Sequence, residues 1–459
     1  MFRRIPSRFL LVLPLFLVAC TVGPDYQKPE GIAAASYKAT GLKAPPPTGS
    51  WWSGFSDRKL SQLLSQAEKA NPQARAALAR LDQSRAILGL RRNDLLPSVT
   101  GQALATRQQD STRDIFPIPP DPYSRYRATL NLNYEIDFWG RIRRSVRQQE
   151  ALSQAAAADY ITALLSTKAE IARDYLALRH LDDEIEVLEN AIGLREKNER
   201  LVKSRLDAGD TTAIDYARAE SQTETARADL FRVKQRRVEL ENAIAVLVGQ
   251  NPSTSKIALA EPPRTPQVPA GVPADLLRRR PDVAATERRL AAAAEQIGIT
   301  LADYLPRVAL TVTGGSAALS TSDLFQRNSR LWVISPTVDF PIVTFGRKDK
   351  AVAQAKAAYY EALENHRDSV LGAFRDVENA LSGIANLDRA LAAQRKATAS
   401  AAEASRLVML RFETGLSSFF EVIDAQREEL LERRTLAQTE AARQLVTVQL
   451  IQALGGGWK

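Results

Sequence analysis

The chain repeats itself at an offset of 206 residues. This repeat predicts a fold built from two copies of one unit, and it says more about the fold than the length of the chain does. The matched positions carry an arginine, a glycine and an acid in the same order; they are Arg205, Gly209 and Asp215 in the first copy and Arg411, Gly415 and Glu421 in the second. We place the two copies at residues 55–250 and 274–459, joined by a Pro-rich connector at 251–273.

Each copy contains one very long stretch that lacks proline, at residues 141–207 and 347–413. Both stretches are rich in Ala, Leu, Glu, Gln and Arg, which favour helices. A helix of this length would extend for about 100 Å, and such helices are typical of coiled coils and helical repeats. Gly209 and Gly415 stand where the chain must reverse, which suits a residue that tolerates positive φ. We therefore expect long helical hairpins at 141–249 and 347–455.

Apolar and polar residues alternate ahead of each hairpin, most clearly from Ala128 to Phe138. The same alternation is found around residues 308–313 and 332–340, so we expect two pairs of strands, at about 96–138 and 305–340. Strands with one apolar and one polar face are typical of transmembrane barrels. The alternative is a soluble antiparallel sheet with one wet face.

The number of strands bears on how such a barrel could close. Single-chain barrels start at about eight strands, and open sheet edges are not tolerated in lipid. Two copies of four strands would make a barrel whose lumen is filled by side chains, whereas three copies leave room for water. A conducting pore therefore favours a trimer, with a mainly α fold and a transmembrane β-barrel.

The N-terminus has the layout of a secretory signal peptide at residues 1–19, with three arginines ahead of a short apolar stretch. The segment that ends at Cys20, the only cysteine, resembles a lipobox, so we expect Cys20 to be acylated and to begin an extended segment at 20–54. A chance thiol near the cleavage site is the alternative. Thr21 in place of the aspartate that retains bacterial lipoproteins at the inner membrane favours the outer membrane.

The composition gives no sign of catalysis or of nucleic-acid binding. The net charge is +9, three of these charges lie in the leader, and the remainder is interleaved with acids, as on a solvated surface. His180 and His366 are the only histidines, and we expect both at ordinary helix-surface positions with no metal site. There is no phosphate-binding loop and no nucleophile elbow. We therefore expect no enzyme and no cofactor besides the lipid on Cys20.

Several motifs in order resemble the TolC-like outer-membrane factor family, in its lipoprotein branch of efflux channels from resistance-nodulation-division pumps. They lie at residues 20–29, at Trp51, Trp52 and Phe55, at residues 135–141 and 275–282, and at the Gly415 turn ending at Gln426. The resemblance covers nearly the whole mature chain. It implies a homotrimer with a 12-stranded β-barrel continued by a 12-helix periplasmic α-barrel.

The resemblance also implies a function. A lipid-anchored channel in the outer membrane would extend into the periplasm and passively conduct small molecules, such as drugs and toxic organics. Its partners would be a periplasmic adaptor, an inner-membrane transporter and outer-membrane lipid. Type I protein secretion through the same architecture is one alternative. A lipid-anchored periplasmic adaptor is another, although adaptors lack the second hairpin and the paired strands.

The resemblance places a periplasmic gate just after the second turn, at Phe420, Glu421 and Asp424. In a trimer the two acids would give six carboxylates around one axis, which raise one another's pKa and attract cations. Phe420 would add an apolar ring. The alternative is that Glu421 and Asp424 form a solvated helix face and cap the helix.

The duplication predicts that the two turns differ in charge. Asp215 occupies the place of Glu421, but Arg218 occupies the place of Asp424. Asp215 and Arg218 are three residues apart and can pair on their own helix. We therefore expect the first turn to be neutralised and outer, and the second turn to carry the gate charge.

Docking of the adaptor is expected in grooves between helix pairs near Gly209 and Gly415. Arg205 and Arg411 lie at matching places, where they could contact a partner or hold the closed state. A salt bridge along the helix is the alternative for each arginine.

Overall fold

The computed structural model describes residues 21–29, 37–38, 50–111, 113, 122–269 and 279–456. The signal peptide, Cys20 and residues 275–278 of the charged motif lie outside the described residues, as does most of the segment 20–54. The chain divides into two compact units; unit 1 comprises Met1–Pro29, Leu81–Ala156 and Thr286–His366, and unit 2 comprises Glu30–Arg80, Ala157–Ala285 and Arg367–Lys459.

The two halves of the chain share an order of elements, except that α1 of the first half has no counterpart among the described residues of the second. The first half contains α1 (Arg58–Ala70), α2 (Pro72–Asn93), β1 (Ser98–Gln108), β2 (Tyr123–Ile136), α3 (Arg141–Asp207) and α4 (Ala213–Leu247). The second contains α6 (Pro281–Ala302), β3 (Arg307–Ala318), β4 (Arg330–Asp339), α7 (Arg347–Glu413) and α8 (Phe419–Ala453). Helices α3 and α7 each have 67 residues, and α4 and α8 each have 35. The duplicated, mainly helical fold predicted from the sequence is confirmed.

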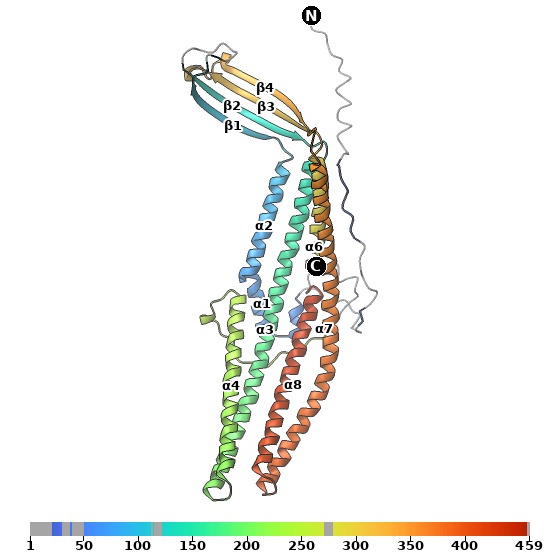
Figure 1. Ribbon diagram of the computed structural model, residues 1–459. Helices are drawn as coiled ribbons and strands as arrows, with labels where there is room; N and C mark the ends of the chain where they lie inside the picture. The colour runs from blue at the N-terminus through green and yellow to red at the C-terminus, as the bar shows by residue number, and fades with distance from the viewer. Residues whose placement is uncertain are drawn as a thin grey trace. The chain divides into compact units, whose positions relative to one another are not determined.

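In unit 1 the strands form one antiparallel sheet in the order β1-β2-β3-β4 (Figure 1). The register aligns like residues across all four strands. One row is apolar and consists of Val99, Leu132, Val312 and Ile334; the next row is polar and consists of Ser98, Asn133, Thr311 and Ser335. Because successive side chains point to opposite faces, one face of the sheet is apolar and the other polar. Within the described residues, β1 and β4 each pair on one side only.

The helices were also compared with the length and hydropathy that a membrane span requires. Among the described residues, no helix combines the two well enough to cross a bilayer.

The core of unit 2 forms where α1 and the short 3-10 helix Trp51–Phe55 pack on the long helices. Trp51, Phe55 and Leu60 are buried in one cluster with residues of α3, α4 and α8. Asp57 caps α1 by accepting a bond from the Leu60 amide at 2.8 Å, and it also accepts one from the Tyr175 hydroxyl at 2.8 Å. Trp51 is thus part of this core, and Trp52 packs against it.

The expectation that both histidines lie on helix surfaces is wrong. His180 and His366 are each only 8% exposed. In unit 2, Nε2 of His180 lies 3.1 Å from Oε1 of Gln444, and in unit 1, Nδ1 of His366 lies 3.1 Å from Oγ1 of Thr286. Burial lowers the pKa of both rings. The reason is that these helices pack against neighbours on more than one side. Among the described residues, no group of three or more metal-binding side chains occurs.

In unit 2, α3–α4 and α7–α8 are antiparallel hairpins, and α8 also contacts the first hairpin. Arg434 of α8 places Nε 2.8 Å from Oε1 of Glu184 on α3, and Nη1 3.3 Å from Oδ2 of Asp229 on α4. The place of Arg434 in the first copy is taken by Ala228. The two hairpins are thus held together by a cation that only the second copy supplies.

Candidate functional site

The two hairpin turns have the same backbone. Gly209 and Gly415 have φ of 79° and 77°, the left-handed region that favours glycine. The amide after each glycine donates back into the helix end at 2.8 Å, from Asp210 to the Arg205 carbonyl and from Leu416 to the Arg411 carbonyl. Such bonds use carbonyls that the helix end leaves free.

Each following helix begins with a hydroxyl cap and an acid three residues later. The side chains of Thr212 and Ser418 accept from the amides of Asp215 and Glu421. In return, the Thr212 hydroxyl donates to the Asp215 carboxylate at 2.8 Å, and the Ser417 hydroxyl donates to the Glu421 carboxylate at 2.7 Å. The hydrogen bond from this hydroxyl is the largest cause of the lowered pKa of each acid. Glu421 therefore contributes to the cap of its helix, in addition to its proposed role in the gate.

The charged residues beyond the caps differ between the turns. Arg218 lies 3.9 Å from Asp215 on its own helix, which balances the first turn. Asp424 is paired as well, because Arg427 approaches it to 2.7 Å. We did not predict Arg427, although its spacing from Asp424 signals such a pair; Ser221 takes its place in the first copy. Asp215 is thus paired with Arg218 and Asp424 with Arg427, while Glu421 is bound by the Ser417 hydroxyl.

Aromatic side chains of the second turn separate into buried and exposed members. Phe412 and Phe419 are each 6% exposed and pack with Val202 of the first hairpin. Phe420 is 56% exposed. The guanidinium of Arg218 lies 5.4 Å from its ring centroid. Phe420 is therefore the aromatic residue of this turn that remains available to line a pore.

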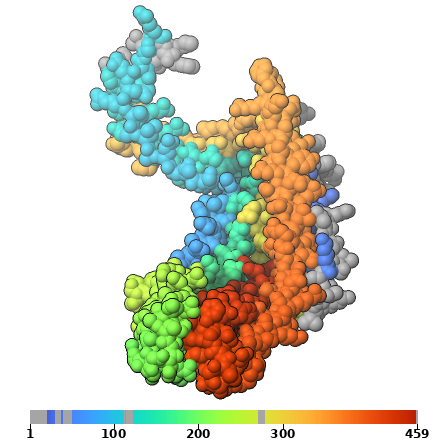
Figure 2. Space-filling model, turned by 60° about the horizontal axis from the view of Figure 1, so that its bottom comes forward, coloured from blue at the N-terminus to red at the C-terminus, as the bar shows by residue number. Residues whose placement is uncertain are grey.

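Arg205 and Arg411 have different partners despite their matching places. The guanidinium of Arg205 lies 4.5 Å from the ring centroid of Phe412, in the other hairpin. Arg411 donates to the Leu416 carbonyl at 3.2 Å and so closes its own turn. Neither forms the salt bridge along the helix that was the alternative. The space-filling view shows the two turns side by side (Figure 2).

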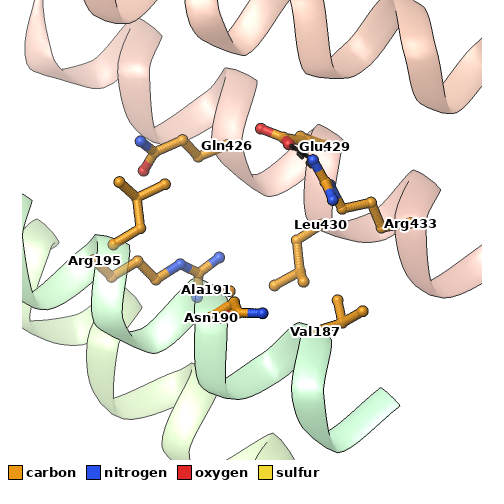
Figure 3. A pocket seen from close by; sticks show the side chains of 9 residues that line it. Val187, Asn190, Ala191, Arg195, Gln426, Glu429, Leu430 and Arg433 are labelled. Carbon is orange, nitrogen blue, oxygen red and sulfur yellow. Dashed lines mark hydrogen bonds and ion pairs between the residues drawn. The ribbon is translucent and has the colours of Figure 1, made fainter. Parts of the chain in front are cut away.

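A groove of about 200 Å³ lies between α3 and α8 (Figure 3). It is lined from both helices by Val187, Asn190, Ala191, Leu194, Arg195, Gln426, Glu429, Leu430 and Arg433. Arg195 donates to the Gln222 carbonyl at 2.8 Å, and burial lowers its pKa. This groove was not predicted from the sequence, because its lining comes from helix faces more than 200 residues apart.

Comparison with known proteins identifies the family of the chain. The sequence pattern of the outer membrane efflux protein family matches residues 63–250 and again residues 272–456. Each match spans most of one copy of the duplicated unit. The chain belongs to this family.

The similarity to individual members of the family extends over nearly the whole channel. Outer membrane protein OprJ of Pseudomonas aeruginosa is 30% identical, over 98% of this chain and 95% of OprJ. The toluene efflux pump outer membrane protein TtgF of Pseudomonas putida is 29% identical, over 98% and 96%. The structure of the outer-membrane channel OprN has a TM-score of 0.91 and 31% identity, over 96% of this chain and 100% of that one.

These matches confirm the predicted role. The protein is an outer-membrane efflux channel that extends into the periplasm. As a member of this family it works as a homotrimer with a periplasmic adaptor and an inner-membrane transporter. The match of both halves to a channel family also decides against the alternative of a lipid-anchored adaptor.

Proposed function

We propose that three copies of the sheet close a 12-stranded barrel, in which β1 of one copy pairs with β4 of the next. The register of the sheet carries this proposal, because it gives all four strands a common apolar face. Trp332 and Ile334 on that face are 76% and 58% exposed, as lipid-facing side chains would be in an isolated chain. Closure would satisfy the backbone groups of both edges, which lipid cannot do.

The helical hairpins of three copies would continue the pore as a 12-helix tunnel, and the second turns would close it. Phe420 would supply an apolar ring, and Glu421 and Asp424 six carboxylates, of which three are offset by Arg427. The net charge favours cations over anions at the constriction. Arg205, Gly209, Arg411 and Gly415 would form the end that meets the adaptor. The groove at Arg195 adds a second surface on which adaptor helices could pack.

The proposed role requires binding surfaces and a polar lumen but no catalytic group. An acyl chain on Cys20 would anchor the protein to the outer membrane, and this lipid would be its only non-protein group. Its cargo would be small organic molecules, a class to which the toluene of TtgF belongs.

A deletion strain tests the choice of cargo. Loss of the gene should increase sensitivity to dyes, detergents and organic solvents, and the intact gene should restore resistance. A matched pair of variants, Asp424→Ala and Asp207→Ala, controls for expression, since Asp207 is an exposed acid of the first turn and the proposal expects only Asp424→Ala to alter the gate. Unchanged sensitivity together with loss of a secreted protein would contradict efflux and favour type I secretion.

A further inference from the structure

The first described residues of the chain are held against α3 and α6 in unit 1. The amide of Val22 donates to the Trp139 carbonyl at 3.1 Å. Tyr26 packs against a cluster of alanines on α3 and α6. Lys28 forms an ion pair with Glu287 of α6 at 2.9 Å. The segment Thr21–Pro29 is therefore bound along its length, although it has no regular secondary structure.

The centre of this contact is Arg144, whose side chain is fully buried. Its Nη1 donates to Oε2 of Glu295 at 2.7 Å and to the Pro24 carbonyl at 3.2 Å. Its Nη2 donates to the Gly23 carbonyl at 2.9 Å and to Oδ1 of Asp25 at 3.2 Å. A buried guanidinium is costly unless its donors are satisfied. Here three of the four acceptors belong to the N-terminal segment, so the arginine and the segment depend on each other.

Three glycines make room for the segment. Gly23 has a φ of +107°, and a Cβ there would lie 2.6 Å from Cα of Gly298. A Cβ on Gly298 would lie 2.4 Å from Cδ of Arg144. Gly140 has a φ of +78°, and a Cβ there would lie 2.5 Å from Cγ2 of Thr21. The backbone of these glycines thus leaves the space that the segment occupies.

We propose that Arg144, Glu295, Gly140 and Gly298 form a docking site for the chain's own residues 21–26. The site fixes the lipid-bearing end beside the junction between β2 and α3, because Thr21 packs on Gly140. The proposed acyl group on Cys20 would then be attached directly next to the docked residues, with no free segment between them. This last consequence rests on the proposed acylation of Cys20, whereas the docking itself does not.

Hydrogen–deuterium exchange of the full-length protein, purified in detergent, tests the docking site. In Arg144→Met, the peptide that contains Val22 should exchange at least about tenfold faster, while peptides from β1–β4 keep their rates. Arg179→Met is the matched control, since Arg179 is also buried, at 2% exposure, but binds in unit 2. It should leave the Val22 peptide unchanged. Unchanged exchange in Arg144→Met, or equal acceleration of the strands, would overturn the proposal.

A second pair of variants tests the site from the side of the segment. Gly23→Ala leaves Arg144 intact but introduces the clash with Gly298, so it should release the Val22 peptide as well. Gly193→Ala is its control, because a Cβ there meets nothing within 4 Å. Persistent protection in Gly23→Ala would count against the docking site.

The intact mass of each protein reports acylation separately. Absence of the acyl group would refute the proposed anchor. A mass that includes the acyl group, together with no release of the Val22 peptide in Arg144→Met, would refute only the docking.

Discussion

The two hairpin turns share a backbone but differ in how their charged side chains are paired. Both have a left-handed glycine, a hydroxyl cap and an acid bound to that cap. In the first turn Arg218 pairs with Asp215, the acid bound to the cap. In the second turn Arg427 pairs with Asp424, while the acid at the cap, Glu421, is bound by Ser417. The comparison teaches that the duplicated sequence preserves what the fold of a turn requires. Side chains outside the turn backbone differ in their contacts: Arg205 stacks on Phe412 of the other hairpin, whereas Arg411 closes its own turn.

The largest effect is expected where the second hairpin contacts the first. Arg434→Met should lower the free energy of unfolding by about 2 kcal/mol, because it leaves Glu184, 8% exposed, without its cation. Thermal unfolding of the detergent-purified protein, followed by circular dichroism, measures this. Arg433→Met is the control, since Arg433 is 51% exposed and its partner Glu429 lies on the same helix, so it should have little effect. Equal effects of the two variants would contradict the proposed link.

The glycines test whether the turns are equivalent in backbone. Gly209→Ala and Gly415→Ala should each cost about 1.5 kcal/mol, because an L side chain is strained at these φ values although space is free. The two unfolding midpoints should shift equally. A large cost at only one turn would show that the turns are not equivalent.

The helix caps also test whether the two turns are equivalent, with a smaller expected loss of stability. Thr212→Ala and Ser418→Ala should each cost about 1 kcal/mol, since each removes the acceptor of one helix-start amide. Urea unfolding of both variants would measure it. Serine and threonine exchanged between the two sites should have almost no effect, and a cost from that exchange would argue against a simple capping role.

The smallest effect concerns His180, which links α3 to Gln444 of α8. Burial lowers its pKa, although the nearby carboxylates of Asp183 and Glu440 oppose this. The unfolded chain therefore binds the proton more readily, so stability is full above pH 6.5 and is lost as the pH falls through the folded pKa. His180→Gln should unfold like the parent at pH 8 and show a shallower loss towards pH 5. An unchanged slope would assign the pH dependence to other groups.

Much of the fold follows from local patterns in the sequence. The absence of proline and the positions of Gly209 and Gly415 predict where α3 and α7 begin and end, and alternation predicts the strands. Contacts across the hairpins are not predictable in this way. Long Ala-rich helices have no clear apolar stripe to show which face meets a neighbour. The stacking of Arg205 on Phe412, the burial of His180 and the docking of the N-terminal segment on Arg144 all depend on such faces.

The most direct test of the difference between the turns is single-channel recording of the purified protein in planar bilayers. Asp424→Ala should change the conductance and reduce the preference for cations, because it removes one carboxylate per copy and leaves Arg427 unpaired. Arg218→Ala should change both quantities less, because Arg218 contacts the proposed gate only through the ring of Phe420. The account would be contradicted if Asp424→Ala changed neither conductance nor cation selectivity while Arg218→Ala changed them.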